Sequence, residues 1–237
     1  MLEIINVFKS IKEKKIISDI SFNVNYGEIF GLLGPNGAGK TSTFYIIAGL
    51  INADKGNVIL EKEDITTTPM HLRSNLGLKY LPQEPSIFLN LTVMDNLYGL
   101  AELSFKSKAD IKKFIDTSIE EFDLSDILNF KGRQLSGGQR RKVEIARTLA
   151  SKPKIILLDE PFAGIDPIAI EDIKNVLTKL SKKNIGILIT DHNVRETLEI
   201  CNQAAIINNG ELIAEGDKKS LINNDLVKKV YLGDMYS

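Results

Sequence analysis

The sequence predicts an α/β fold with a mainly parallel core sheet, and three short apolar segments carry this prediction. Segments 29–33, 155–158 and 185–189 are rich in Ile and Leu and show no alternation of apolar with polar residues. Such runs are typical of strands buried on both faces of a parallel sheet. Each run leads directly into glycines or polar side chains, and ligands of open α/β sheets bind at the carboxyl ends of the strands. The sequence therefore predicts one shared site at this edge.

Length and composition indicate an ordinary globular chain. It has 237 residues, 43% of them hydrophobic and 26% charged, with a formal net charge of −1. This charge gives no electrostatic reason to expect nucleic acid as a partner. The single cysteine, Cys201, rules out an intrachain disulfide and favours a reducing cytoplasm. We find no secretory signal and no apolar run of the roughly 18–20 residues that a bilayer crossing needs, so a membrane role would require another chain to cross.

Helices and a hairpin are predicted around these strands. Asp166 followed by Pro167 is a helix-start signal, and apolar residues then recur at helical spacing. Asn209 followed by Gly210, between two short apolar runs, predicts a tight β-hairpin. The stretch from 92 to 150 reads as mostly helical. We therefore expect a single domain, 1–237, with a helical subdomain inserted at about 86–150 and a short helical extension at 216–237.

The first strand leads into a predicted phosphate-binding loop. Residues 34–41 read GPNGAGKT, which satisfies the pattern G-x-x-x-x-G-K-[ST]. Its glycines leave backbone N–H groups free to wrap phosphates, and the following helix adds the positive end of its dipole. A glycine turn that only caps a helix is the alternative, but the position between a buried strand and a helix favours nucleotide binding. The residues expected to bind are Gly34, Pro35, Asn36, Gly37, Ala38, Gly39, Lys40, Thr41 and Ser42, with Lys40 on the β- and γ-phosphates and the Thr41 hydroxyl on Mg²⁺.

The second strand ends in Asp159 and Glu160. We expect Asp159 to hold Mg²⁺, directly or through water. Glu160 is expected to orient the attacking water and accept its proton, a role typically worth about 10²- to 10⁴-fold in rate. An acidic turn before Pro161 is the alternative, and the phosphate loop in the same chain favours the catalytic interpretation.

Segment 135–139 reads LSGGQ and has two compatible interpretations. Ser136 and Gln139 match a capping box that opens a helix. A helix N-terminus with two glycines and a hydroxyl is also a phosphate site, yet the chain contains one nucleotide loop. We therefore expect a second copy, related by a two-fold axis, to supply the nucleotide that these residues contact: Ser136, Gly137, Gly138 and Gln139.

Together, the phosphate loop, LSGGQ, the ILLDEP string at 156–161 and His192 resemble the ATP-binding domain of the ABC ATPase family over nearly the whole chain. The resemblance implies a P-loop NTPase fold with an N-terminal antiparallel β subdomain, ATP hydrolysis with ATP and Mg²⁺, and a head-to-tail, ATP-dependent homodimer. It also implies that Gln83 ligates Mg²⁺ and senses a transmembrane partner, and that His192 contacts the γ-phosphate. Segment 163–166 matches the loop that communicates between the two sites. The catalytic residues are then Glu160 and His192, and the metal ligands are Thr41, Gln83 and Asp159.

One position departs from the family pattern. The family usually has an aromatic residue before the first β-hairpin, stacked on adenine, and Ile11 occupies that position here. Base-on-aromatic stacking is worth about 1–3 kcal/mol, which an isoleucine recovers only in part. We expect weaker base selectivity, with Phe8 as a substitute platform.

Segments 162–167, 189–197 and 230–233 resemble the lipopolysaccharide-export ATPases of Gram-negative bacteria. This resemblance implies a motor that drives lipopolysaccharide out of the inner membrane through two transmembrane permease subunits. The chain would then be cytoplasmic and peripheral on the cytoplasmic face of the inner membrane. Phe88 would line the groove for a permease coupling helix, with Leu89 and Asn90 where that group has basic residues.

Two alternatives remain open. ATPases of branched-chain amino-acid importers end in a similar Tyr-Leu-Gly segment but usually carry Glu-His-Asp at the switch, whereas residues 190–193 read TDHN here. Soluble ABC ATPases that act on nucleic acid or the ribosome form the other class, but they carry long coiled coils or a second ATPase domain. His71, Cys201 and the cluster 140–142 lack a comparable context and are interpreted as a surface histidine, a core thiol and a mainly solvated helix face.

Overall fold

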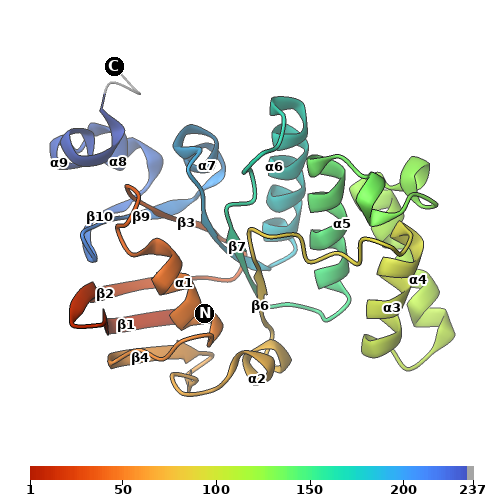
Figure 1. The fold of residues 1–237 in the computed structure, drawn as a ribbon, viewed down its shortest axis with the longest axis horizontal. Coiled ribbons are helices and arrows are strands. Elements are labelled where there is room, and N and C mark those ends of the chain that lie inside the picture. The colour runs from red at the N-terminus through yellow and green to blue at the C-terminus, as the bar shows by residue number, and fades with distance from the viewer. Residues whose placement is uncertain (234–237) are drawn as a thin grey trace.

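A six-stranded and a four-stranded sheet organise the chain in the computed structural model, which describes residues 1–233 (Figure 1). The strands of the large sheet, in spatial order, are β10 (Glu211–Gly216), β9 (Gln203–Asn208), β3 (Ile29–Leu33), β8 (Gly186–Thr190), β7 (Ile155–Asp159) and β6 (Leu78–Leu81). Every neighbouring pair in this sheet is parallel except the pair of β9 with β10, which is antiparallel. The small sheet is antiparallel, in the order β2 (Lys14–Val24), β1 (Leu2–Ile11), β4 (Lys55–Leu60) and β5 (Glu63–Asp64).

The three predicted core strands are neighbours, which confirms the parallel-sheet prediction. Every residue of β3, β7 and β8 is buried. Burial on both faces explains why these strands lack apolar–polar alternation. Asp159 pairs with Thr190 at the ends of β7 and β8, so the polar residues that follow the two strands leave the sheet side by side.

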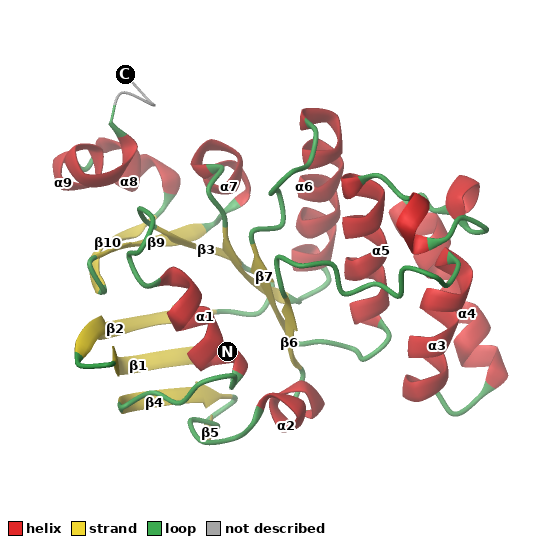
Figure 2. Ribbon diagram, viewed as in Figure 1, coloured by secondary structure: helices red, strands yellow, loops and turns green. Residues whose placement is uncertain are grey.

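Alternate residues of the core strands face opposite sides of the large sheet. Phe30 and Leu157 share a core with the small sheet and with α1 (Lys40–Ala48), which lies between the two sheets. Ile156 and Ile187 face the opposite side, where α5 (Gly137–Leu149) and α6 (Pro167–Lys182) cover the sheet (Figure 2). Helix α2 (Met70–Asn75) joins the small sheet to β6.

The stretch predicted to be helical contains α3 (Val93–Ser104), α4 (Lys108–Phe122) and two 3₁₀ helices, Ser125–Ile127 and Gly132–Gln134, before α5 begins. Helices α3 and α4 lie at the end of the molecule farthest from the small sheet (Figure 2). Thr92 and Ser107 cap their N-termini. The division of the chain at 86 and 150 remains a prediction.

The remaining helix and turn signals are found where the sequence placed them. The Asp166 carboxylate accepts a hydrogen bond from Ala169 N and caps α6, whose first residue is Pro167. Asn209 and Gly210, at φ 49° and 81°, form the turn between β9 and β10. The C-terminal elements are α7 (Val194–Ile200), α8 (Lys218–Asn223), α9 (Asp225–Val227) and a π-helical turn, Lys228–Leu232. The last four residues of the predicted extension, 234–237, lie outside the described residues.

Within residues 1–233, none of the helices combines the length and the apolar composition that a bilayer crossing requires.

Candidate active site

The loop after β3 is shaped by glycines that no other residue could replace without strain. At Gly34, with φ 150°, an added Cβ would lie 2.0 Å from the carbonyl oxygen of Ile207. Gly39, with φ 108°, occupies the N-cap of α1, where there is no capping side chain. The N–H groups of the first turn of α1 are therefore left for a ligand, and the helix dipole favours an anion there.

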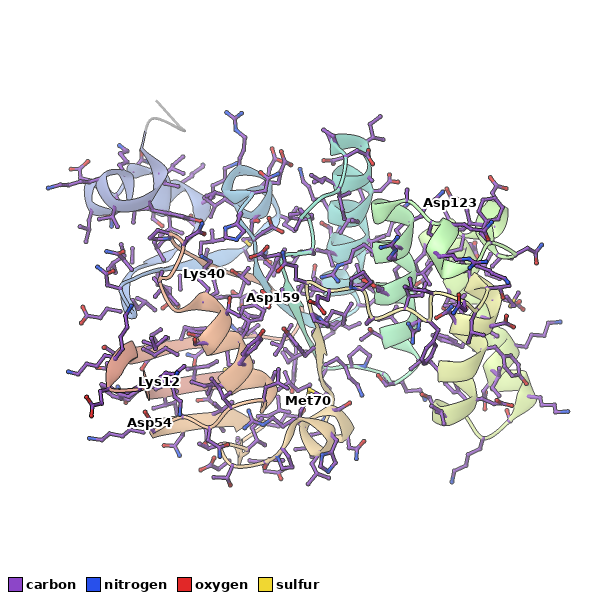
Figure 3. The ribbon with its side chains drawn as sticks, viewed as in Figure 1. Lys12, Lys40, Asp54, Met70, Asp123 and Asp159 are labelled. Carbon is purple, nitrogen blue, oxygen red and sulfur yellow. The ribbon has the colours of Figure 1, made fainter. Side chains whose placement is uncertain are left out.

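Lys40 lies within this loop. Its Nζ donates to the carbonyl oxygens of Gly34 at 2.7 Å and Pro35 at 3.0 Å, and only 6% of the residue is exposed. Burial lowers the Lys40 pKa, and the negative charges of Glu160 and Asp159 oppose this shift. Figure 3 labels Lys40 and Asp159 in the middle of the molecule. The ammonium is thus fixed inside the loop, where an incoming phosphate would meet it.

An open pocket of about 410 Å³ surrounds the loop. Segment 36–42, Glu160 and His192 line it, together with Lys14 and Ile16 of β2. Lys14 and Ile16 were not predicted from the sequence, because a strand residue that faces a loop from another part of the chain carries no motif. Ile11 does not line the pocket, but it pairs with Lys14 and is 46% exposed, so it lies at the rim.

Phe8 does not line this pocket either. It is half-buried and pairs with Lys55 of β4, on the side of β1 away from β2. The geometry therefore gives no support to Phe8 as a platform for the base.

A second pocket, of about 460 Å³, adjoins the first. Thr41, Gln83 and Asp159, the three predicted metal ligands, all line it, and Thr41 and Glu160 line both pockets. A hydroxyl, an amide and a carboxylate offer the oxygen atoms that Mg²⁺ prefers, so the residues fit this ion.

Tyr80 contacts the carboxylate of Asp159. Its hydroxyl donates to Asp159 Oδ2 at 3.1 Å from the neighbouring strand β6. Asp159 is 5% exposed, and burial raises its pKa while the Tyr80 hydrogen bond opposes the shift. Tyr80 precedes Gln83 by only three positions, but nothing in the sequence showed that its hydroxyl faces Asp159.

Glu160 and His192 come from different strand ends and meet. His192 Nε2 lies 2.7 Å from Glu160 Oε1. Glu160 adopts φ 47°, a left-handed conformation that glutamate rarely takes, and its N–H donates to the carbonyl of Thr190 at 2.8 Å. Such backbone strain gathers at functional sites. Here the strained turn directs the carboxylate into the pocket of the phosphate loop.

Asp191 forms hydrogen bonds to the two loops that carry Glu160 and His192. Its Oδ2 accepts from the N–H of Phe162 and its Oδ1 from that of Asn193, both at 2.8 Å. The side chain is almost fully buried, and burial raises its pKa. In the sequence, Asp191 is part of the string TDHN after a predicted strand, and no motif assigns it this role.

The LSGGQ segment opens α5 with the predicted capping box. Ser136 Oγ accepts from Gln139 N at 3.2 Å, and Gln139 Oε1 accepts from Ser136 N at 3.0 Å. Ser136 and Gly137 are exposed, whereas Gly138 is buried where an added Cβ would lie 2.3 Å from Ala169 Cβ of α6. Segment 136–139 contributes no residue to the pocket around Lys40, although Gly137 lines a smaller pocket together with Gln83 and Glu160.

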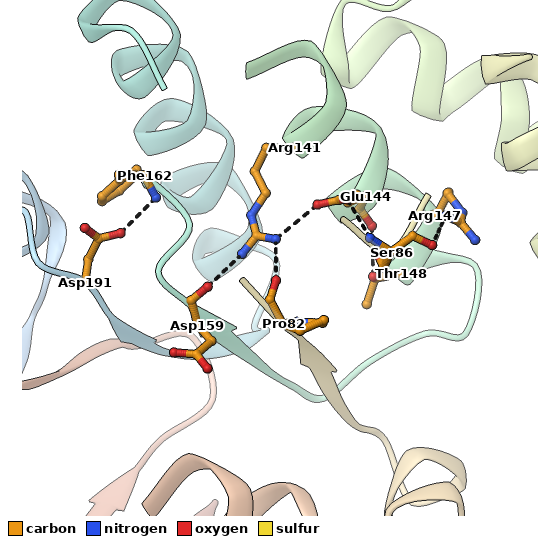
Figure 4. A network of polar contacts seen from close by, with 9 residues as sticks. All are labelled: Pro82, Ser86, Arg141, Glu144, Arg147, Thr148, Asp159, Phe162 and Asp191. Carbon is orange, nitrogen blue, oxygen red and sulfur yellow. Dashed lines mark hydrogen bonds and ion pairs between the residues drawn. The ribbon is translucent and has the colours of Figure 1, made fainter. Parts of the chain in front are cut away.

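The interpretation of 140–142 as a mainly solvated face is wrong for Arg141. This residue is 5% exposed, and its guanidinium donates to the carbonyls of Pro82 and Asp159 and pairs with Glu144 (Figure 4). Three consecutive basic residues gave no sign of which one points inward. His71 is exposed, as predicted, and burial of the Cys201 thiol, which faces Gly31, raises its pKa.

Comparison with known proteins identifies the family. The profile of the family described as "ABC transporter" matches residues 17–163. The chain is 51% identical over 232 residues to the "Lipopolysaccharide export system ATP-binding protein LptB" of Haemophilus influenzae, covering 98% of this chain and 96% of that protein.

Solved structures agree with this result. The ADP conformation of MJ1267, an ATP-binding cassette of an ABC transporter, matches with a TM-score of 0.87 and 31% identity, covering 98% of each chain. The dimeric structure of MJ0796, a bacterial ABC transporter cassette, matches with a TM-score of 0.79 and 25% identity over 92% of this chain and 99% of that one. The chain therefore belongs to the ABC transporter family, as an ATP-binding cassette that hydrolyses ATP.

Proposed function

We propose that this chain is the motor of a lipopolysaccharide exporter and that it works as a head-to-tail homodimer. The observation that supports lipopolysaccharide as the substrate is the 51% identity, over 98% of the chain, to a relative named for lipopolysaccharide export. The geometry of the site supports the roles that we assign to individual residues in ATP hydrolysis.

We assign the triphosphate to the loop 34–42. The uncapped N-terminus of α1 and the buried ammonium of Lys40 support this assignment. Thr41, Gln83 and Asp159 are the residues that would hold Mg²⁺, because they line one pocket with oxygen-bearing side chains. Bound there, the ion would neutralise charge that develops on the phosphates.

Glu160 is the proposed general base. Water attacks the γ-phosphorus while the bond to the bridging oxygen of ADP breaks, and Glu160 accepts the proton that the water loses. His192 is proposed to orient the carboxylate of Glu160 and to face the γ-phosphate. The 2.7 Å contact between the two side chains supports this pairing.

The residues Ser136 to Gln139 of the LSGGQ segment are proposed to contact the nucleotide of a second chain. They are separate from the pocket around Lys40, and Ser136 and Gly137 are exposed at a helix N-terminus that favours an anion. A dimeric cassette among the similar structures is consistent with this arrangement. Removal of the γ-phosphate that both chains bind would let the dimer open.

Two transmembrane permease subunits are the proposed partners, on the cytoplasmic face of the inner membrane. Phe88 and Leu89, which are 54% and 46% exposed, form an apolar pair shortly after Gln83. We assign this pair to the permease contact, where a closing or opening dimer would push on the transport subunits.

Reconstitution tests the proposal. The tagged chain is purified from membranes of its own host with the proteins that remain bound, and the complex is placed in vesicles that contain lipopolysaccharide. ATP-dependent extraction of lipopolysaccharide that is lost in Glu160→Gln would support the assignment. Uptake of leucine or isoleucine by the same vesicles would show an importer instead, and ATPase activity bound to ribosomes without a membrane partner would exclude both.

A further inference from the structure

Three charged side chains on one face of α5 contact the segment that carries Gln83. Arg141, Glu144 and Arg147 follow one another at three-residue spacing, which places side chains on one side of a helix. All three are buried, with exposed fractions of 5%, 4% and 7%. We call these three residues the polar ladder.

The polar ladder holds the chain on both sides of Gln83 (Figure 4). Before Gln83, Arg141 Nη1 donates to the carbonyl of Pro82 at 3.0 Å. After it, the N–H of Ser86 donates to Glu144 Oε1 at 2.8 Å, and Arg147 Nη1 donates to the carbonyl of Ser86 at 2.9 Å. Residues 83–85 between these anchors are exposed. Gln83 therefore lies on a short loop whose two ends are attached to α5.

Arg141 also reaches the strand that carries Asp159. Its Nη2 donates to the carbonyl of Asp159 at 3.4 Å, and its Nη1 pairs with Glu144 Oε2 at 3.1 Å. One guanidinium thus contacts the backbone at the end of β7 and the backbone beside Gln83. Hydrogen bonds that involve charged groups are stronger than neutral ones, and burial strengthens them further.

Arg147, at the far end of the polar ladder, contacts the exposed aromatic ring of Phe88. The Arg147 guanidinium lies 4.9 Å from the centroid of the Phe88 ring. Asn96 of α3 also holds the backbone of Phe88, by accepting from its N–H and donating to its carbonyl. A displacement of α5 would therefore move the loop of Gln83 and the exposed Phe88 together.

We infer that Arg141 is a positioning residue for ATP hydrolysis: it sets where Gln83 lies relative to Asp159, and through the polar ladder it links both to Phe88. Two of the three proposed metal ligands then depend on one side chain that donates hydrogen bonds to backbone carbonyls beside them, those of Pro82 and Asp159. The meaning of Phe88 as a partner contact rests on the proposed function, whereas the link between α5, Gln83 and Asp159 does not.

The test compares Arg141→Lys and the double variant Arg141→Met/Glu144→Met with Lys142→Gln. Lysine keeps the charge but loses the fork that reaches two carbonyls, and the double variant removes both members of the Arg141–Glu144 ion pair together. Lys142 pairs with the half-exposed Asp172 of α6 and is the matched control on the same helix. Each full-length chain is assayed for ATPase rate and for affinity toward a fluorescent ATP analogue. Hydrogen exchange with and without ATP is then measured in the Glu160→Gln background.

In both Arg141 variants we expect the turnover rate to fall about 10- to 100-fold, because small misplacements of reacting groups have effects of this size. The affinity for the ATP analogue should stay within about threefold of wild type, because the loop 34–42 is intact. Segment 82–88 should exchange faster and lose its response to ATP, while segment 34–41 stays protected by ATP. Lys142→Gln should behave like wild type.

An unchanged response of segment 82–88 to ATP in Arg141→Lys would overturn the inference. So would a turnover rate equal to that of Lys142→Gln, or unfolding of Arg141→Lys, which would reduce Arg141 to a structural residue. These measurements use the isolated chain without permeases or lipid. Failure of the export assay would therefore leave their result intact, and failure here would leave the export proposal standing.

Discussion

The imidazole of His192 meets the carboxylate of Glu160, Nε2 to Oε1 at 2.7 Å, although the two residues follow different strands. The contact is possible because β7 and β8 end level with each other, and because Glu160 turns in the left-handed conformation. The carboxylate is consequently held on one side by His192 and faces the phosphate loop on the other.

Replacement of Glu160 by Gln removes the proposed base and keeps the shape of the side chain. We expect ATP binding to persist and hydrolysis to fall by about 10²- to 10⁴-fold. ATP should then convert the protein into a stable dimer, because the γ-phosphate that joins two chains is no longer removed. Phosphate release and light scattering with and without ATP measure the two effects. Glu120→Gln, an exposed position on α4, is the control. Near-normal hydrolysis in Glu160→Gln would exclude Glu160 as the base.

Asp191→Asn tests whether the two catalytic loops depend on one buried carboxylate. Asn keeps one acceptor but presents an NH₂ group to one of the N–H groups of Phe162 and Asn193, so one buried donor loses its partner. We expect a loss of about 1–3 kcal/mol in the free energy of unfolding. The turnover rate should also fall while ATP affinity stays near that of wild type. Denaturant unfolding and steady-state kinetics check this expectation, and an unaffected turnover rate would contradict it.

Much of this fold could be predicted from the sequence, because the decisive signals are local. The loop 34–41, the capping box at Ser136 and the Asn209–Gly210 turn each carry their own stereochemical requirement within a few residues. Burial on both faces likewise identified β3, β7 and β8 as parallel strands.

The contacts that the sequence did not reveal join segments far apart in the chain. Arg140 and Arg141 are identical in type, and only the position of β7 and of segment 82–86 decides that Arg141 points inward. Tyr80 and Asp159 meet through strand pairing. Lys14 and Ile16 reach the pocket because β2 passes beside the phosphate loop. Such contacts follow from the tertiary arrangement, which no short motif encodes.

Ser136→Arg should block the composite site without preventing its own chain from binding ATP. The substitution removes an N-cap, at a cost of about 0.5–2 kcal/mol, and places a large cation where the partner's phosphate would lie.

ATPase activity should be lost in Ser136→Arg and in Lys40→Ala, each as a homodimer. A mixture of the two should recover activity, because the mixed dimer keeps one site with Lys40 from one chain and Ser136 from the other. With free exchange of chains, roughly a quarter of wild-type activity is expected if the sites act independently. Ser136→Ala, which loses the cap and the hydroxyl but adds neither bulk nor charge, should lose less activity than Ser136→Arg, and no recovery on mixing would exclude the head-to-tail arrangement.

Tyr80→Phe removes the hydroxyl that donates to Asp159 Oδ2. Loss of a hydrogen-bond partner of a metal ligand typically costs about 10- to 100-fold in metal affinity. We expect the Mg²⁺ concentration for half-maximal ATPase activity to rise by about tenfold, with metal-free nucleotide binding unchanged. Titration of Mg²⁺ at fixed ATP measures the first effect and equilibrium binding in EDTA the second. Tyr98→Phe, on the exposed face of α3, controls for the substitution itself. An unchanged Mg²⁺ requirement would show that Asp159 is positioned without Tyr80.

Ile11→Tyr restores an aromatic ring at the rim of the nucleotide pocket. Ile11 is 46% exposed at the end of β1 and pairs with Lys14, which lines the pocket, so a larger side chain can be accommodated without disturbing the core. Stacking on a base is worth about 1–3 kcal/mol, which corresponds to about fivefold or more in affinity. We therefore expect Ile11→Tyr to bind ATP more tightly and to discriminate better between ATP and GTP, as measured by competition with a fluorescent analogue.

The control is Ile5→Tyr, on the same strand and 38% exposed, which should change neither the ATP affinity nor the discrimination. Equal discrimination in wild type and Ile11→Tyr would mean that the base is held by other residues, of which Ile16 of β2 is an apolar candidate in the pocket lining.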